Sequence, residues 1–107
     1  MTTASDTIPH PARAELELSA VLHALSDAHR LRIVAGLAAG IDPRTCGSFT
    51  LPVTKSTCTH HFKVLREAGV IRQRQEGTAR LNTLRREDLD ARFPGLLDSI
   101  LASAAAA

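Results

Sequence analysis

Aromatic residues are nearly absent from this sequence. Of its 107 residues three are phenylalanine, and none is tryptophan or tyrosine. Proteins that bind single-stranded nucleic acid commonly stack the bases on exposed aromatic rings. The scarcity of such rings therefore disfavours RNA and single-stranded DNA as ligands, and it leaves double-stranded DNA open.

Long hydrophobic runs are also missing. No stretch approaches the roughly 20 apolar residues that a transmembrane helix needs. The N-terminal residues lack the basic segment followed by an apolar one that marks a signal peptide. We therefore expect a cytoplasmic protein with no membrane partner.

Motifs of catalysis are missing too. The sequence has no metal-hydrolase motif, no glycine-rich phosphate loop and no nucleophile elbow. It has two cysteines, Cys46 and Cys58, which in the cytoplasm are expected to be reduced thiols. We expect neither an enzyme nor a bound cofactor.

Positive charge, by contrast, is concentrated in one part of the chain. The net charge is only +2, but residues 54–86 carry +6 and the rest of the chain carries −4. A basic segment on an acidic body is typical of proteins that bind a polyanion. The length of the chain indicates one domain with a small core.

The basic region begins with a predicted amphipathic helix. Thr54 suits the N-cap, and Gly69 suits the left-handed residue that ends a helix. His61 lies on the apolar side, where we expect a hydrogen-bonded structural histidine. An ordinary solvated helix would show the same pattern. At about 100° per residue, the apolar side holds Cys58, His61, Phe62, Val64, Leu65 and Ala68, and the polar side holds Lys55, Ser56, Thr59, His60, Lys63 and Arg66.

Two helices are predicted before this one. Residues 1–12, with two prolines and several small polar residues, are expected to form a disordered arm. Apolar residues at helical spacing predict helices over residues 13–25 and 27–39, and Gly40 ends the second. Residues 41–53 contain two prolines and have room for one short helical turn at most.

A hairpin and a last helix are predicted after it. Two alternating runs around Glu76-Gly77-Thr78 predict a β-hairpin over residues 70–84. One helical turn fits residues 87–91, and Pro94 suits the first position of a last helix. Residues 104–107 are expected to fray.

This order of elements, over residues 13–103, is that of a winged helix-turn-helix, a mainly α fold with a small β-hairpin. Three segments then resemble the arsenic-repressor (ArsR/SmtB) family. Leu25–Leu37 is similar to the second helix of that family, Ser56–Val70 to its recognition helix, and Glu76-Gly77 to the turn of its wing.

The resemblance implies a homodimeric bacterial transcription repressor, in which the first and last helices form the dimer. The apolar stripes on those helices agree with this, because a monomer exposing both would tend to aggregate. The interface residues so indicated are Leu18, Val21, Leu22, Leu96, Leu97, Ile100 and Leu101.

A two-fold dimer would place two recognition helices about one DNA turn, roughly 34 Å, apart. Its partner should therefore be an inverted-repeat operator in double-stranded DNA. We expect contacts to base edges or nearby phosphates from the start of the helix, contacts to phosphates from its later cations, and contacts along the minor groove from the wing. These three groups are Lys55, Ser56, Thr59 and His60; then Lys63 and Arg66; then Arg74, Gly77, Thr78 and Arg80.

The inducer is the open question at this stage. Many relatives in the family that the chain resembles release DNA on binding metal, but here Cys46 lacks a Cys-x-Cys partner and no histidine follows His61. We therefore predict no metal site of the usual types. Alternatives are a soft site of Cys46, Cys58 and His61, a redox switch through Cys46 and Cys58, an unknown small-molecule or oxidant inducer, and a winged helix that binds an acidic protein instead of DNA.

Overall fold

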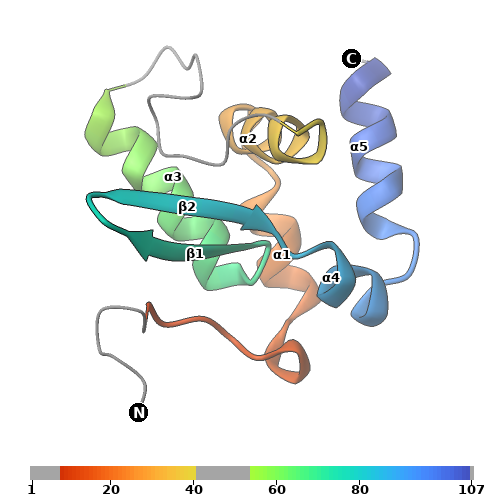
Figure 1. Cartoon of the computed structure of the whole chain (residues 1–107). Coiled ribbons are helices and arrows are strands. Elements are labelled where there is room, and N and C mark those ends of the chain that lie inside the picture. Colours follow the sequence, from red (N-terminus) through yellow and green to blue (C-terminus); the bar gives the residue numbers. More distant parts are fainter. Residues whose placement is uncertain (1–7, 41–53, 107) are drawn as a thin grey trace.

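Figure 1 shows the computed structural model of the chain, which describes residues 8–40 and 54–106. Within these residues, five α-helices and one short 3-10 helix accompany a two-stranded antiparallel sheet. The predicted fold class, a mainly α winged helix-turn-helix with a small hairpin, is confirmed. The elements are η2 (Arg13–Glu15), α1 (Leu18–Ala24), α2 (Ala28–Ala38), α3 (Lys55–Ala68), β1 (Ile71–Glu76), β2 (Ala79–Leu84), α4 (Arg86–Arg92) and α5 (Leu96–Ala106).

The first predicted helix is broken in two. Between η2 and α1, Leu16 has an extended backbone (φ −67°, ψ 131°), and its side chain is only 1% exposed. Its side chain packs beside Gly69, and its carbonyl oxygen accepts a hydrogen bond of 2.6 Å from Arg92 Nη2. A continuous helix over residues 13–25 is therefore wrong, because Leu16 is drawn into the core between segments far away in the sequence.

Helix α2 begins and ends where local signals place its ends. The Asp27 carboxylate caps the helix by accepting from the backbone N–H groups of His29 (2.9 Å) and Arg30 (3.1 Å). Gly40, just beyond the helix, has the positive φ of 86° that glycine tolerates. The predicted turn in residues 41–53 lies outside the described residues.

Helix α3 spans the predicted recognition helix and lies against α1, α2 and β1. The Thr54 hydroxyl accepts from Thr57 N–H at 3.2 Å, and Gly69 takes the left-handed conformation (φ 85°). The inner side of α3 joins one core with residues from every described α-helix. That core consists of Leu16, Val21, Ala24, Leu25, Ile33, Val34, Cys58, Phe62, Leu65, Ala68, Val70, Ile71, Leu89 and Leu97.

Strands β1 and β2 form the wing, in a register that pairs Ile71 with Leu84 and Glu76 with Ala79. The two-residue turn between the strands contains Gly77 at φ 60°, as the hairpin signal predicts. In Figure 1 the wing runs across the front of α3, with its tip at the left.

The C-terminal helices depart from prediction in two details. Helix α4 runs over Arg86–Arg92, a little longer than the single turn expected, and α5 begins at Leu96 rather than at Pro94. The Gly95 carbonyl accepts the first helical hydrogen bond, from Ser99 N–H at 3.1 Å. Helix α5 continues to Ala106, three residues beyond the predicted end of the folded domain at residue 103. None of the described helices is long and apolar enough to cross a membrane.

The predicted disordered arm is wrong for its second half. Residues 8–12 pack along the wing: His10 Nε2 accepts from Gln73 N–H at 2.9 Å, and the Pro11 carbonyl accepts from Arg85 Nη1 at 2.8 Å. Residues 1–7 lie outside the described residues. Because Gln73 and Arg85 lie more than 60 residues further along the chain, no local sequence pattern predicts these contacts.

Candidate nucleic-acid interface

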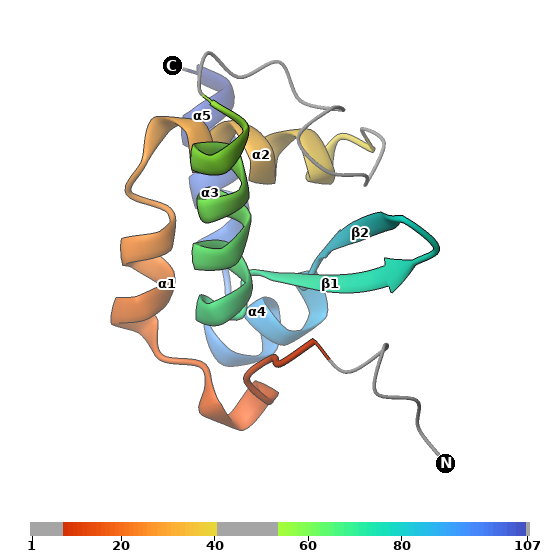
Figure 2. The same cartoon turned by 90° about the vertical axis from the view of Figure 1, so that its left-hand side faces the viewer.

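The polar side of α3 is open to solvent. Four of the predicted contact residues, Ser56, Thr59, His60 and Lys63, are exposed, and Figure 2 shows α3 at the front of the molecule between α1 and the wing. Lys55 is the first residue of α3, and its side chain lies outside the described part of the structure. An exposed helix that carries hydroxyl, imidazole and ammonium groups suits the major groove, where such groups reach base edges and phosphates.

The start of α3 carries a further exposed hydroxyl group, that of Thr57, which is not among the predicted contact residues. Thr57 is exposed, and its hydroxyl accepts from the Thr54 hydroxyl at 2.9 Å. Ser56 Oγ lies 3.3 Å from the same Thr54 oxygen. The two hydroxyls therefore sit beside the positive end of the helix dipole, which favours anions. The capping signal at Thr54 predicts the helix start, but which neighbouring side chains group there depends on their rotamers.

A buried polar junction holds the inner side of α3. His61 is 6% exposed, and its Nδ1 lies 3.1 Å from Nη1 of Arg30, which is 8% exposed. Arg30 also donates to the carbonyl oxygens of Ala24 (2.6 Å) and His23 (3.3 Å) at the end of α1. One arginine thus joins α1, α2 and α3. The predicted role of His61 as a hydrogen-bonded structural histidine is confirmed.

The same junction fixes the protonation state of His61. Burial lowers the pKa of its imidazole below the usual value, and the nearby Arg30 lowers it further, while Asp27 acts in the opposite direction. Because Nδ1 faces a guanidinium donor, it must act as the acceptor, which leaves the ring proton on Nε2. Asp27 Oδ2 is 3.8 Å from that nitrogen, so at neutral pH the contact joins a carboxylate to a neutral ring.

The same surroundings shift the pKa of Asp27, the carboxylate that caps α2. Burial by itself raises the pKa of Asp27, but the backbone hydrogen bonds from Arg30 and His29, together with the positive charge of Arg30, outweigh it and bring the pKa below the usual value. Asp27 therefore stays ionised as the cap of α2.

The outer part of the wing carries one exposed cation, Arg74, and one half-buried cation, Arg80. The Arg74 side chain is 63% exposed and forms an ion pair of 3.1 Å with the equally exposed Glu76. Gly77 and Thr78 are exposed in the turn, and Arg80 is half-buried on β2. Exposed ion pairs of this kind contribute little to stability, so Arg74 is available to a phosphate that competes with Glu76.

The positive footprint is smaller than the sequence count indicates. Arg85 is buried and binds Asp88 Oδ2 at 2.8 Å, and Arg86 binds Asp98 at 2.8 Å. Arg66 is half-buried and donates to Gln73 Oε1 at 2.9 Å, so it is turned toward the wing. Because Asp88 and Asp98 lie outside residues 54–86, a count of the charges within that segment overstates the positive charge that faces a polyanion.

The predicted dimer residues divide into two groups. Val21 and Leu97 are buried in the core of the protomer (1% and 2% exposed), so they offer almost no surface to a partner subunit. Leu18 and Leu22 are 47% and 45% exposed on α1. Leu96, Ile100 and Leu101 on α5 are partly buried against the core.

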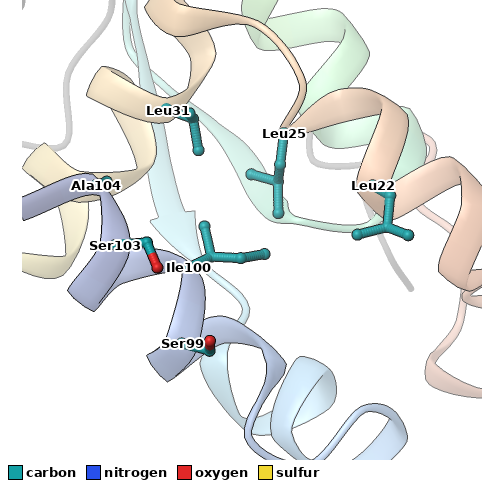
Figure 3. A pocket seen from close by; sticks show the side chains of 7 residues that line it. All are labelled: Leu22, Leu25, Leu31, Ser99, Ile100, Ser103 and Ala104. Carbon is teal, nitrogen blue, oxygen red and sulfur yellow. The ribbon is translucent and has the colours of Figure 1, made fainter. Parts of the chain in front are cut away.

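An apolar groove opens beside the exposed leucines. It lies between α1, α2 and α5 and has a volume of about 380 Å³. In Figure 3, Leu22, Leu25 and Ile100 line it, and the Ser99 and Ser103 hydroxyls stand along α5. The remaining lining residues are Leu31 and Ala104. The groove and the exposed leucines together form one apolar surface.

The candidate redox residue Cys58 is disulfide-bonded in this structure. Cys58 is 2% exposed on the inner side of α3, and Cys46 lies outside the described residues. A functional redox switch through Cys46 and Cys58 stays a prediction. Among residues 8–40 and 54–106, no three histidine, cysteine or acidic side chains are grouped to hold a metal ion.

Comparison with known proteins points to the same part of the fold. A family model described as a helix-turn-helix domain matches residues 25–74, from the end of α1 through α2 and α3 into β1. The chain is also similar to the uncharacterized HTH-type transcriptional regulator YceK of Bacillus subtilis (strain 168). The two are 32% identical over 82 residues, which are 75% of this chain and 82% of that protein. The role named there is transcriptional regulation.

Proposed function

The chain belongs to the helix-turn-helix-type transcriptional regulators, and on that premise we propose that it is a homodimeric repressor of the ArsR/SmtB family that binds an inverted-repeat operator. DNA-binding regulation follows from the family itself. Dimerisation, repression and the form of the operator are what the proposal adds.

The observation that carries the proposal is the pairing of an open polar helix face with a rigid buried one. Ser56, Thr59 and His60 are exposed on α3, while Arg30 and His61 fix the opposite side to α1 and α2. A recognition helix must hold its side chains in register with base edges, and a fixed inner face supplies this. The wing tip then offers Arg74 and Arg80 to the flanking backbone.

Exposed apolar surface on α1 supports the homodimer. Leu18 and Leu22 are nearly half exposed, and Leu22 lines the apolar groove between α1, α2 and α5. In a two-fold interface the same patch meets its own copy, so one surface must carry both protruding and receiving parts. The leucines and the adjacent groove fulfil that requirement.

Salt-dependent binding to duplex DNA tests the proposal. The logarithm of the binding constant falls linearly with the logarithm of the salt concentration, and each lost phosphate contact reduces the magnitude of this slope by about 1. In a dimer that binds DNA with both wings, Arg74→Ala combined with Arg80→Ala removes four such contacts, so it should flatten the slope by about 4 and weaken binding to all sequences similarly. Arg86→Ala is the matched control, because Arg86 pairs with Asp98 on α5 and should leave the slope unchanged.

Two results would contradict the proposal. An unchanged slope in the double variant would remove the wing from the interface. No salt-sensitive binding of the wild-type protein to duplex DNA would refute DNA reading altogether, and it would favour a winged helix that binds an acidic protein partner.

A further inference from the structure

Three parts of the chain meet at one buried residue, Gln73 on β1, through its side-chain amide and its backbone N–H. Its Oε1 accepts from Arg66 Nη1 of α3 at 2.9 Å, and its Nε2 donates to Asn82 Oδ1 of β2 at 2.8 Å. Its backbone N–H donates to His10 Nε2 of the arm at 2.9 Å. Gln73 is 4% exposed and Asn82 is 0% exposed, so water does not compete for the bond between these two side chains.

This pair lies where the wing leaves the body. Along β1, Ile71 and Gln73 are buried, while Arg74 and Glu76 are exposed and Gln75 is half-buried. Gln73 and Asn82 face each other in the register and are the outermost fully buried pair before the tip. A two-stranded hairpin alone is marginally stable, so its direction depends on this last attachment.

An amide pair at this place costs desolvation that two apolar side chains would not. What the amides add is direction, because hydrogen bonds constrain angle as well as distance. The Gln73–Arg66 bond is the part of the network that joins the wing to α3. Arg66 keeps this position although its buried Nε has no hydrogen-bond partner among the described residues, which costs free energy.

The arm completes the attachment from the outer edge of β1. His10 can accept from Gln73 only while Nε2 keeps its lone pair. Burial lowers the pKa of His10, a backbone hydrogen bond at Ile8 opposes this, and Arg72 and Arg66 lower the pKa further. The neutral ring therefore acts as a hydrogen-bonded cover for an otherwise open strand edge.

We propose that Gln73 is a positioning residue for DNA binding, which sets the angle between the wing and α3 through Arg66 and Asn82 so that the wing tip and the recognition helix reach one duplex together. The inference rests on the proposed function and deepens it. Gln73 itself touches no DNA, and its effect passes through Arg74 and Arg80 at the tip.

The test compares Gln73→Leu, and Gln73→Leu combined with Asn82→Leu, with the wild-type protein. The double variant replaces the amide pair by an apolar pair, so it keeps the wing folded if Gln73→Leu alone unfolds it. In the folded variant the magnitude of the salt slope should fall by about 4 for the dimer, as in the Arg74→Ala/Arg80→Ala protein. Adding those two arginine substitutions to the folded variant should then lower the slope no further.

A purely structural role predicts a different result. It would lower the thermal midpoint of the leucine variants but leave both the salt slope and the effect of Arg74→Ala/Arg80→Ala intact, and this overturns the inference. If the wild-type protein shows no salt-sensitive binding to duplex DNA, the proposed function fails and the inference fails with it. Normal wild-type binding with an unchanged slope in a folded leucine variant defeats only the inference.

Discussion

The junction beneath the recognition helix makes a quantitative prediction for His61→Ala. His61 is 6% exposed, and its Nδ1 is the acceptor for Nη1 of the buried Arg30. Removing the ring leaves a charged donor unpaired, which costs about 1–3 kcal/mol. The space left by the ring adds a cavity term, and together we expect a loss of about 3–5 kcal/mol. Small domains have a total stability of about 5–15 kcal/mol, so the variant should be severely weakened.

His61→Asn is the matched control, because its side-chain oxygen can take the place of Nδ1 and keep the bond to Arg30. It should cost about 1–3 kcal/mol less than His61→Ala. Urea unfolding at one fixed protein concentration measures both free energies, since the stability of a dimer depends on concentration. Adding Arg30→Met to His61→Ala should be less than additive, because it removes the unpaired charge.

The reasoning is refuted if His61→Ala costs less than about 1 kcal/mol. It is equally refuted if His61→Ala and His61→Asn cost the same and the effects of His61→Ala and Arg30→Met simply add. Either result would mean that the junction does not hold α3 to the body.

Three further predictions concern the same framework. Burial and Arg30 lower the folded-state pKa of His61. The contribution of His61 to stability should therefore be complete above the unfolded pKa of about 6.5 and be lost as the pH falls toward the folded-state pKa. Urea titrations at a series of pH values should show this loss, and His61→Asn should make the stability less dependent on pH. Gly69→Ala should destabilise by about 2–5 kcal/mol, because φ is 85° and an added Cβ would overlap the Leu16 side chain. Gly77→Ala, with φ of 60° and open space around it, should cost only about 1–2 kcal/mol, and equal thermal shifts for the two would contradict the packing of Leu16. Asp27→Ala should cost about 1–2 kcal/mol through the lost cap, whereas Asp27→Asn keeps a capping oxygen and should cost less than half as much in the same unfolding assay.

Local signals are enough to predict α3 and the wing. Thr54 caps α3 and Gly69 ends it, and the apolar residues between them recur at helical spacing, so each signal acts within one or two turns of chain. The Glu76-Gly77 turn likewise specifies the hairpin between its own two strands. These elements have the predicted type and nearly the predicted bounds.

Distant contacts account for what the sequence does not predict. Leu16 interrupts a predicted helix because its side chain packs beside Gly69 and its carbonyl oxygen accepts a hydrogen bond from Arg92. Val21 and Leu97 match an exposed stripe by spacing, but they are buried in the protomer. The direction of Arg66 depends on Gln73, which belongs to a different element. In each case the residue that determines the local structure comes from another part of the fold, so composition and periodicity do not predict the contact.

The most direct test of the account is a selection of binding sites from a random duplex library, performed with the wild-type protein and with Thr59→Ala. The account predicts an inverted repeat whose half-site centres lie about 10–10.5 base pairs apart, or a multiple of that spacing. It also predicts that Thr59→Ala changes the preferred base at the same position in both half-sites. Selection of no common sequence, or of the same sequence by both proteins with equal discrimination, would contradict the claim that α3 reads the operator.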